Sequence, residues 1–358
     1  MPEVLSFGGS ACAPPQSTEP PTSKAIRRYS VADRTLCFQA VDEPVLDLVH
    51  DFLSGYAFTP ADSSDARNQP VHLPAHLIEI HRSAPPVLSS QNLGFEIEDG
   101  YCYPDHEQIV LVVNGSTIVV SAPELNRTDV WLSDSTAGRH SLALNNVILY
   151  AVQAALRRGG MYQFHAGCVL APDATRGILL VGDSGCGKST LTVNLIRNGW
   201  RFVSDDNLLL RDTSSGIVAW ALRRYFTFDE STLDKCKLSQ FPDAIGQRVP
   251  GDRNKVRFYA RRAFPQSFVE TCLPGVILFP AIGGETQTRI EPVKLGDALA
   301  RLLRQCPWAT CDTAAAPDHV QALTNLIKQT RSYSVITGRD VFDDPSSIPG
   351  LISRQIDD

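Results

Sequence analysis

The chain has 358 residues, a length that suggests two domains. Its 43% hydrophobic content is ordinary for a globular protein, and its formal net charge of -6 offers no general basic field for nucleic acid. We find no secretory signal pattern and no apolar run that could span a membrane, so we expect a cytoplasmic protein that binds neither nucleic acid nor membrane.

The first part of the chain is predicted to be a tail followed by a β-rich α+β domain. Residues 1–24 are rich in Pro, Ser, Gly and Thr and predict a disordered tail. Residues 25–143 are predicted to recognise the substrate; they contain one helix (EPVLDLVHDFLSGY), a strand (HLIEIHRS) and a hairpin turning at Asn114–Gly115. His106, flanked by two acids, suits either a metal ligand or, more simply, an exposed loop histidine.

Residues 144–160 are predicted to form a helix that links the two domains. Apolar side chains recur there at helical spacing. They are Leu144, Ile148, Ala151, Val152 and Ala155. Arg157 and Arg158 suit the C-terminal end of the helix, where the helix dipole is negative, and Gly159 suits the position at which the helix stops.

Residues 161–358 are predicted to form an α/β catalytic domain around a phosphate loop. An apolar strand, a loop that fits G-x-x-x-x-G-K-[ST], and an amphipathic helix follow one another. The glycines let backbone N–H groups surround a phosphate at the start of the helix. Lys188 is expected to reach the β and γ phosphates of ATP, and Ser189 to ligate Mg²⁺. The nucleotide-binding residues expected here are Gly182, Ser184, Gly185, Cys186, Gly187, Lys188, Ser189 and Thr190.

Two further features flank this loop. The segment YQFHAGCVLAP predicts a strand that carries His165 and forms a hairpin with the loop strand. After the helix, WRFVSDDNLLLRD predicts a strand pair, with Asp205 and Asp206 at the end of its first strand, beside the loop strand. One carboxylate could hold Mg²⁺ and the other could take the proton of an acceptor hydroxyl; a solvated acidic turn is the simpler alternative. His165 could reach the same pocket, although a lone strand histidine is more often packed or exposed.

Three motifs of this region resemble the C-terminal domain of HPr kinase/phosphorylase, from a superfamily that includes ATP-type phosphoenolpyruvate carboxykinases. They are FHAGCVLA, GDSGCGKST and NGWRFVSDD, in this order, and the clear likeness runs from Phe164 to Leu210. The resemblance implies a P-loop kinase domain of that type. It also implies Asp205 as general base on a serine hydroxyl, His165 as its partner and Asp206 as an Mg²⁺ ligand, and it allows a homo-oligomer.

The sequence also departs from that family. The family's glutamate-arginine-glycine-rich signature corresponds to WALRRYFTFDEST, where Arg223 or Arg224 stands for the arginine and no glutamate precedes it, so we expect no phosphorylase activity. The N-terminal domain does not resemble that of HPr kinases. The whole chain looks more like the HPr-kinase-related kinases that phosphorylate lasso-peptide precursors on serine.

A basic stretch, GQRVPGDRNKVRFYARRAF, suits either a solvated loop or a clamp on the triphosphate or on an acidic acceptor. We expect Arg257 within it, and Arg224 before it, to contact the nucleotide. The leading hypothesis is a Mg-ATP-dependent kinase that acts on a serine of a peptide or protein. The alternatives are a kinase for a small metabolite with a hydroxyl group and a nucleotide-binding switch that transfers nothing; phosphoenolpyruvate carboxykinase chemistry is disfavoured.

Overall fold

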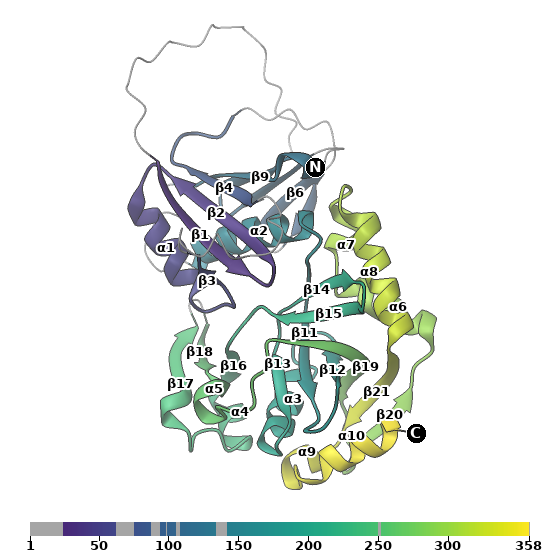
Figure 1. The fold of residues 1–358 in the computed structure, drawn as a ribbon. Coiled ribbons are helices and arrows are strands. Elements are labelled where there is room, and N and C mark those ends of the chain that lie inside the picture. The colour runs from purple at the N-terminus through teal and green to yellow at the C-terminus, as the bar shows by residue number, and fades with distance from the viewer. Residues whose placement is uncertain are drawn as a thin grey trace, which may run out of the picture.

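The computed structural model describes most of the chain after the N-terminal tail (Figure 1). The described residues are 24–61, 75–86, 94–97, 99–104, 108–133, 142–249 and 252–357. The tail expected over residues 1–24 lies outside this part, apart from Lys24, and so does His106. None of the helices in the described ranges is both long and apolar enough to cross a membrane.

The described N-terminal residues form one large, mostly antiparallel sheet in the order β3-β1-β2-β4-β9-β8-β7-β6-β5. The helix α1 (Glu43–Leu53) packs against β1 and β2. The strands are β1 (Ala25–Val31), β2 (Arg34–Ala40), β3 (Thr59–Pro60), β4 (His76–His81), β5 (Phe95–Ile97), β6 (Gly100–Pro104), β7 (Ile109–Val113), β8 (Ser116–Val120) and β9 (Arg127–Trp131), and a short 3₁₀ turn, η2 (Pro123–Leu125), precedes β9. The predicted helix and the strand at HLIEIHRS are therefore confirmed.

The hairpin between β7 and β8 turns where the sequence predicts. Val113 pairs with Ser116, which leaves a two-residue loop. Asn114 has a φ of 49° and Gly115 a φ of 77°, so both central residues are left-handed, as a type I′ turn requires. An asparagine followed by glycine adopts this conformation at low cost, and the predicted hairpin is confirmed.

The helix α2 (Leu142–Arg158) lies where the linking helix was expected, and it packs on the N-terminal sheet. Its apolar face, which includes Val147 and Ile148, is fully buried in the same core as Ile118 of β8. Its C-terminal end is held to the other part of the chain by ion pairs. Arg157 Nε lies 2.7 Å and Arg158 Nη2 2.9 Å from the carboxylate of Asp312, which is fully buried.

The rest of the chain forms a mixed α/β layer in the order β10-β14-β15-β19-β12-β11-β13, with β21 beside β19 and β20 beside β21. Its strands are β10 (Tyr162–Phe164), β11 (Ala166–Leu170), β12 (Arg176–Val181), β13 (Arg201–Ser204), β14 (Leu208–Thr213), β15 (Gly216–Ala221), β19 (Thr271–Ile282), β20 (Arg289–Pro292) and β21 (Arg331–Thr337). Its helices are α3 (Lys188–Arg197), α6 (Leu295–Arg304), α7 (Trp308–Cys311), α8 (Ala316–Gln329), α9 (Asp340–Asp343) and α10 (Ser347–Asp357).

Helices cover both faces of this sheet because its central strands are apolar on both sides. In β12, Ile178 and Leu180 share a core with α3 and α10, whereas Leu179 and Val181 share another with α6 and α8. This division follows from the alternation of side chains along a strand. In Figure 1, α6, α7 and α8 lie along one side of the layer, and α10 lies at its lower end. The expected buried strand LPGVILFPAI and the helix LGDALARLLRQC are confirmed as β19 and α6.

The basic stretch forms most of a third, small sheet rather than a loop. This sheet has the order β16-β18-β17, is not hydrogen-bonded to the large layer, and shares a hydrophobic core with α3 and β13 (Figure 1). Its elements are β16 (Phe226–Asp229), β17 (Ile245–Val249), β18 (Asp252–Phe258), α4 (Glu230–Lys235), α5 (Ala260–Ala263) and the 3₁₀ turn η3 (Pro242–Ala244).

Two expectations about the strands near the phosphate loop are wrong. The strand expected over YQFHAGCVLAP breaks at His165, because β10 pairs with β14 whereas β11 pairs with β12 and β13. The strand that ends before Asp205 is not adjacent to the loop strand, because β11 lies between β12 and β13. Since β11 is antiparallel to both, β12 and β13 still run in the same direction, and their carboxyl ends share one edge of the sheet.

Acid will destabilise the N-terminal sheet through His76. Burial, with the nearby charge of Arg158, lowers the pKa of His76 to about 4, and its ring accepts or donates a 2.8 Å bond with Thr128 Oγ1. Below pH 6.5 the unfolded chain binds a proton at this position that the folded chain refuses, so stability falls between pH 6.5 and 4, by about 3 kcal/mol in total. Urea unfolding at several pH values should give a flatter profile for His76→Gln; equal slopes would contradict this prediction.

Candidate active site

The phosphate loop joins β12 to α3 with the backbone that the motif demands. Gly185 and Gly187 have φ values of 81° and 99°, which other residues rarely adopt. Lys188 is 5% exposed, and its Nζ donates to the carbonyl oxygens of Gly182 at 2.8 Å and Asp183 at 3.0 Å. The ammonium group therefore lies folded over the loop and can turn toward a phosphate group that takes the place of these carbonyls.

The histidine and the aspartate pair meet at the carboxyl end of β13. His165 Nε2 lies 2.8 Å from Asp206 Oδ1. Arg223 Nη2 lies 2.8 Å from Asp206 Oδ2 and 3.5 Å from Asp205 Oδ2. The expected pairing of His165 with Asp205 is thus corrected, since the histidine contacts the second aspartate. The break between β10 and β11 explains how His165 turns toward this edge.

The two aspartates differ strongly in their electrostatics. Asp205 is 2% exposed, and burial raises its pKa to about 7 although Arg223, Ser189 and Lys188 oppose this. Burial also raises the pKa of Asp206, but the charges of Arg223 and His165 outweigh it and hold that pKa well below its usual range. Asp206 is therefore ionised at neutral pH, whereas burial favours the protonated form of the Asp205 carboxyl group.

The surroundings of Asp205 fit a magnesium ion. Within the described ranges, neither of its carboxylate oxygens has a hydrogen-bond partner, which is costly for a buried group. The hydroxyl of Ser189, at the start of α3, is close enough to lower the pKa of Asp205. Carboxylate and hydroxyl oxygens are hard ligands of the kind that Mg²⁺ prefers. These two residues can hold the ion.

A cluster of arginine and tyrosine residues supports the aspartates. The guanidinium groups of Arg223 and Arg257 lie 5.2 Å and 4.7 Å from the centre of the Tyr225 ring, so both cations pack on one aromatic group. Arg257 thus lies on the same tyrosine as the arginine that contacts the aspartates, and its contact with a nucleotide stays a prediction. Arg224 points elsewhere: it lines a separate cavity of about 140 Å³ together with Glu270, and Arg223 contacts the aspartates in its place.

The N-terminal sheet reaches this cluster through the loop after α1. Tyr56 forms a β-bridge with Arg223, and Ala57 donates its N–H to the carbonyl of Leu222 at 2.7 Å. The Tyr56 and Tyr225 rings lie 6.4 Å apart, edge to face. The backbone that carries the aspartate-binding arginine is thus held from both parts of the chain.

Two cavities border the phosphate loop. One, of about 190 Å³, is mostly apolar; it is lined by Gly187 and Thr190 on the loop side and by Ile282 and Phe342 opposite them. The other, of about 420 Å³, is lined by Gly182, Asp183 and Cys186 and by the side chains of α6. Ser184 lies exposed at the tip of the loop. The expected loop residues thus line two cavities, one on each side of the loop.

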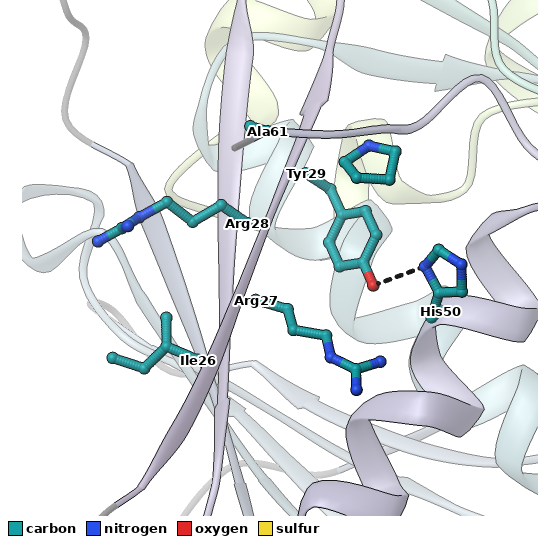
Figure 2. Close-up of a pocket in the computed structure, with 7 residues that line it drawn as sticks. Ile26, Arg27, Arg28, Tyr29, His50 and Ala61 are labelled. Atoms are coloured by element: carbon teal, nitrogen blue, oxygen red, sulfur yellow. Dashed lines mark hydrogen bonds between the residues drawn. The ribbon is translucent and has the colours of Figure 1, made fainter. Parts of the chain in front are cut away.

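Another hollow lies on the N-terminal sheet and belongs to neither the loop nor the aspartates. It measures about 430 Å³ and is lined by β1, by His50, and by Pro60 and Ala61 at the end of β3. Figure 2 shows Tyr29 and His50 pointing toward each other across it, with 3.1 Å between Tyr29 Oη and His50 Nδ1. Arg27 at its edge is already paired with Asp47 at 2.6 Å. This hollow contributes nothing to the candidate active site.

Sequence comparisons connect the chain with HPr kinases. The HPr kinase/phosphorylase of Malacoplasma penetrans is 39% identical over 54 residues, which are 15% of this chain and 18% of that protein. The HPr kinase/phosphorylase of Bordetella pertussis is 25% identical over 190 residues, 50% of this chain and 60% of that protein. Among solved structures, the Hpr(Ser) kinase/phosphatase from Coxiella burnetii matches with 11% identity and a TM-score of 0.29, over 55% of this chain and 92% of that one. No family model matches.

These relatives confirm the predicted resemblance to HPr kinase/phosphorylases. The matches span less than two thirds of the length of either curated relative, 18% of one and 60% of the other. The resemblance is therefore regional, and what the complete relatives do is carried to this chain only as a proposal.

Sequence reasoning left two neighbours of the aspartates without a firm role. Arg223 was one of two candidates for the family's arginine, and its contacts with the two aspartates distinguish it from Arg224, which lines a separate cavity. Asn207, directly after the aspartate pair, accepts a hydrogen bond from Gln163 at 2.5 Å. Its position next to the doublet was the available signal.

Proposed function

We propose that this protein is a cytoplasmic Mg-ATP-dependent kinase that transfers the γ-phosphoryl group to a hydroxyl, that of a serine in a peptide or protein. One observation carries the proposal: an ionised aspartate, held by His165 and Arg223, lies at the same sheet edge as a phosphate loop. A nucleotide-binding switch needs no base for an acceptor hydroxyl. The relatives named HPr kinase/phosphorylase support the same reaction class.

The contacts favour an assignment of the aspartates opposite to the one that the resemblance implies. Asp206 is 23% exposed in its side chain and bonded to His165, so an acceptor hydroxyl can approach it; we assign it as the general base. Asp205 is buried near Ser189, and its nearest described cation, Arg223, lies 3.5 Å away, beyond the length of a strong hydrogen bond; we assign Asp205 and Ser189 to Mg²⁺. When bound, the ion supplies positive charge to the β and γ phosphates.

The chain's own groups position the donor. The loop N–H groups and the start of α3 bind the triphosphate, and Lys188 moves its ammonium from the loop carbonyls to the phosphate oxygens. Arg223, with Arg257 behind it, stabilises negative charge that develops on the transferring group. The apolar cavity beside Gly187 receives the purine ring, because Ile282 and Phe342, which line it, are 71% and 43% exposed and offer apolar surface to a base.

Removing the Phe342 ring will weaken the binding of ATP but not of inorganic triphosphate. Stacking of an aromatic ring on a base contributes about 1–1.5 kcal/mol, so Phe342→Ala should raise the KM for ATP roughly tenfold. Inorganic triphosphate, used as a competitor, should bind the variant and the wild type equally. Leu295→Ala, which truncates another exposed apolar residue, is the control. If ATP and inorganic triphosphate both bind the variant more weakly and to the same extent, the purine ring does not bind at Phe342.

The proposed function is tested with γ-labelled ATP, Mg²⁺ and an extract of the source organism. The products are separated by size, and Lys188→Ala serves as the inactive control. Label on a peptide or protein, absent with the control, supports the proposal. Label on a small molecule would replace it with a metabolite kinase, and label in free phosphate alone would leave an ATPase.

A further inference from the structure

A cavity of about 570 Å³ lies beside the proposed active site, between the N-terminal sheet, α2 and the α/β layer. His165 and Asn207 form part of its wall. His165 is also the residue that holds Asp206, the proposed base. A ligand in this cavity can therefore bring a hydroxyl group to Asp206. Neither part of the chain forms this cavity alone, because both contribute residues to its wall.

The wall of the cavity contains polar and aromatic side chains that a ligand could contact. His319, on α8, is 2% exposed, and neither of its ring nitrogens has a hydrogen-bond partner within the described ranges. Its ring is fixed by stacking on Tyr162, with the centroids 4.4 Å apart. Because an unpaired buried polar group is costly, a donor or acceptor from a ligand would stabilise this arrangement. The rings of Tyr150 and Trp308 lie 6.0 Å apart in the same wall and offer aromatic surface.

The charge of the cavity is negative. Among the described residues that line it, the carboxylates are Glu96 and Asp99, both exposed, and there is no lysine or arginine. Arg157 lies 4.6 Å from the Trp308 ring but is paired with Asp312. Exposed carboxylates and aromatic rings in the wall of one cavity favour a cationic group, through ion pairing and cation–π contact. They disfavour an acidic acceptor.

The extent of the cavity wall favours a segment of chain over a single small metabolite. The volume of about 570 Å³ is that of an ordinary ligand pocket, but its wall runs from His165 to the exposed carboxylates of Glu96 and Asp99. A small hydroxyl compound needs only the His165 end of this wall. A peptide segment that enters from the exposed carboxylates can contact both and still reach the base.

We propose that this cavity is the acceptor site and that the acceptor is a peptide segment in which the serine is flanked by a lysine or arginine; this rests on the proposed kinase function. The serine Oγ forms a bond to the γ-phosphorus while the bond from that phosphorus to the β,γ-bridging oxygen breaks, and ADP leaves. The serine proton passes to the Asp206 carboxylate. The basic side chain lies against Glu96 and Asp99.

The test uses the full-length protein, Mg-ATP and three synthetic peptides that differ only at the residues flanking one serine: lysine, glutamine or glutamate. We expect kcat/KM for the lysine peptide to exceed that for glutamine about tenfold and that for glutamate about a hundredfold. In Glu96→Gln/Asp99→Asn, verified as folded by thermal melting, the three values should converge to within about threefold. The matched control, Glu124→Gln/Asp173→Asn, removes two exposed carboxylates elsewhere and should keep the preference.

Other outcomes separate this inference from the kinase proposal. Equal use of the three peptides, or preference for glutamate, overturns the inference while the chain remains a kinase. If no peptide is phosphorylated, the protein labelled in the extract is sequenced around its phosphoserine. A basic neighbour there supports the inference and its absence overturns it. Label on no acceptor at all, in peptides or extract, refutes the kinase function and the inference together.

Discussion

Asp206→Asn will lower the rate of phosphoryl transfer by about 10²–10⁴-fold, the usual contribution of a positioned general base. The substitution keeps the size of the side chain and leaves one acceptor oxygen for His165 or Arg223, and it removes the negative charge that accepts the hydroxyl proton. The affinity for Mg-ATP should change little, because the loop residues proposed to bind phosphate are untouched. Single-turnover transfer and nucleotide binding, measured separately on the variant, give the two quantities.

Asp205→Asn provides the comparison that decides the roles of the two aspartates. If Asp205 holds Mg²⁺ with Ser189, this variant should require a much higher Mg²⁺ concentration for half-maximal rate and regain activity as Mg²⁺ rises. Asp206→Asn should show no such rescue. The opposite pattern, with rescue in Asp206→Asn alone, would restore the assignment implied by the family resemblance.

Asp312→Asn will destabilise the folded protein by about 3–5 kcal/mol, because it removes the only described anion between two buried arginines. The side chains of Arg157 and Arg158 are 4% and 2% exposed, so neither can regain full hydration without opening the contact between α2 and the segment before α8. Chemical denaturation followed by tryptophan fluorescence measures the change, since Trp308 lies against Arg157.

The control for this experiment is Asp318→Asn. Asp318 is exposed on α8, so its loss should change the free energy of unfolding by less than about 0.5 kcal/mol. A loss below about 1 kcal/mol for Asp312→Asn would mean that the two arginines relax into water and that the ion cluster does not hold the two parts of the chain together.

Local patterns in the sequence predicted most elements correctly. The hairpin at Asn114–Gly115 and the helix after Lys188 depend on nearby residues, so motif and spacing were sufficient. Strand adjacency depends on distant partners. For that reason the sequence could not indicate that β11 separates β12 from β13, or that the strand breaks at His165.

In the candidate site, too, the sequence predicted what depends on neighbouring residues and missed what depends on distant ones. The residues of the phosphate loop are consecutive, and the sequence located them together. The choice of Asp206 as the partner of His165, and of Arg223 over Arg224, depends on the direction of side chains after the ends of β13 and β15. Neither contact leaves a trace in local spacing. The lining of the 570 Å³ cavity, drawn from three separate regions, was likewise beyond the reach of motifs.

The bridge between Tyr56 and Arg223 limits how freely this architecture can be recombined. A chimaera that joins a foreign N-terminal domain to the α/β layer would lose the backbone contacts that the loop after α1 makes with Leu222 and Arg223. Exchange of domains to redirect specificity would thereby also disturb the charge around the aspartates. If the N-terminal domain selects the acceptor, as proposed, new specificities are better sought by point changes within the existing domain.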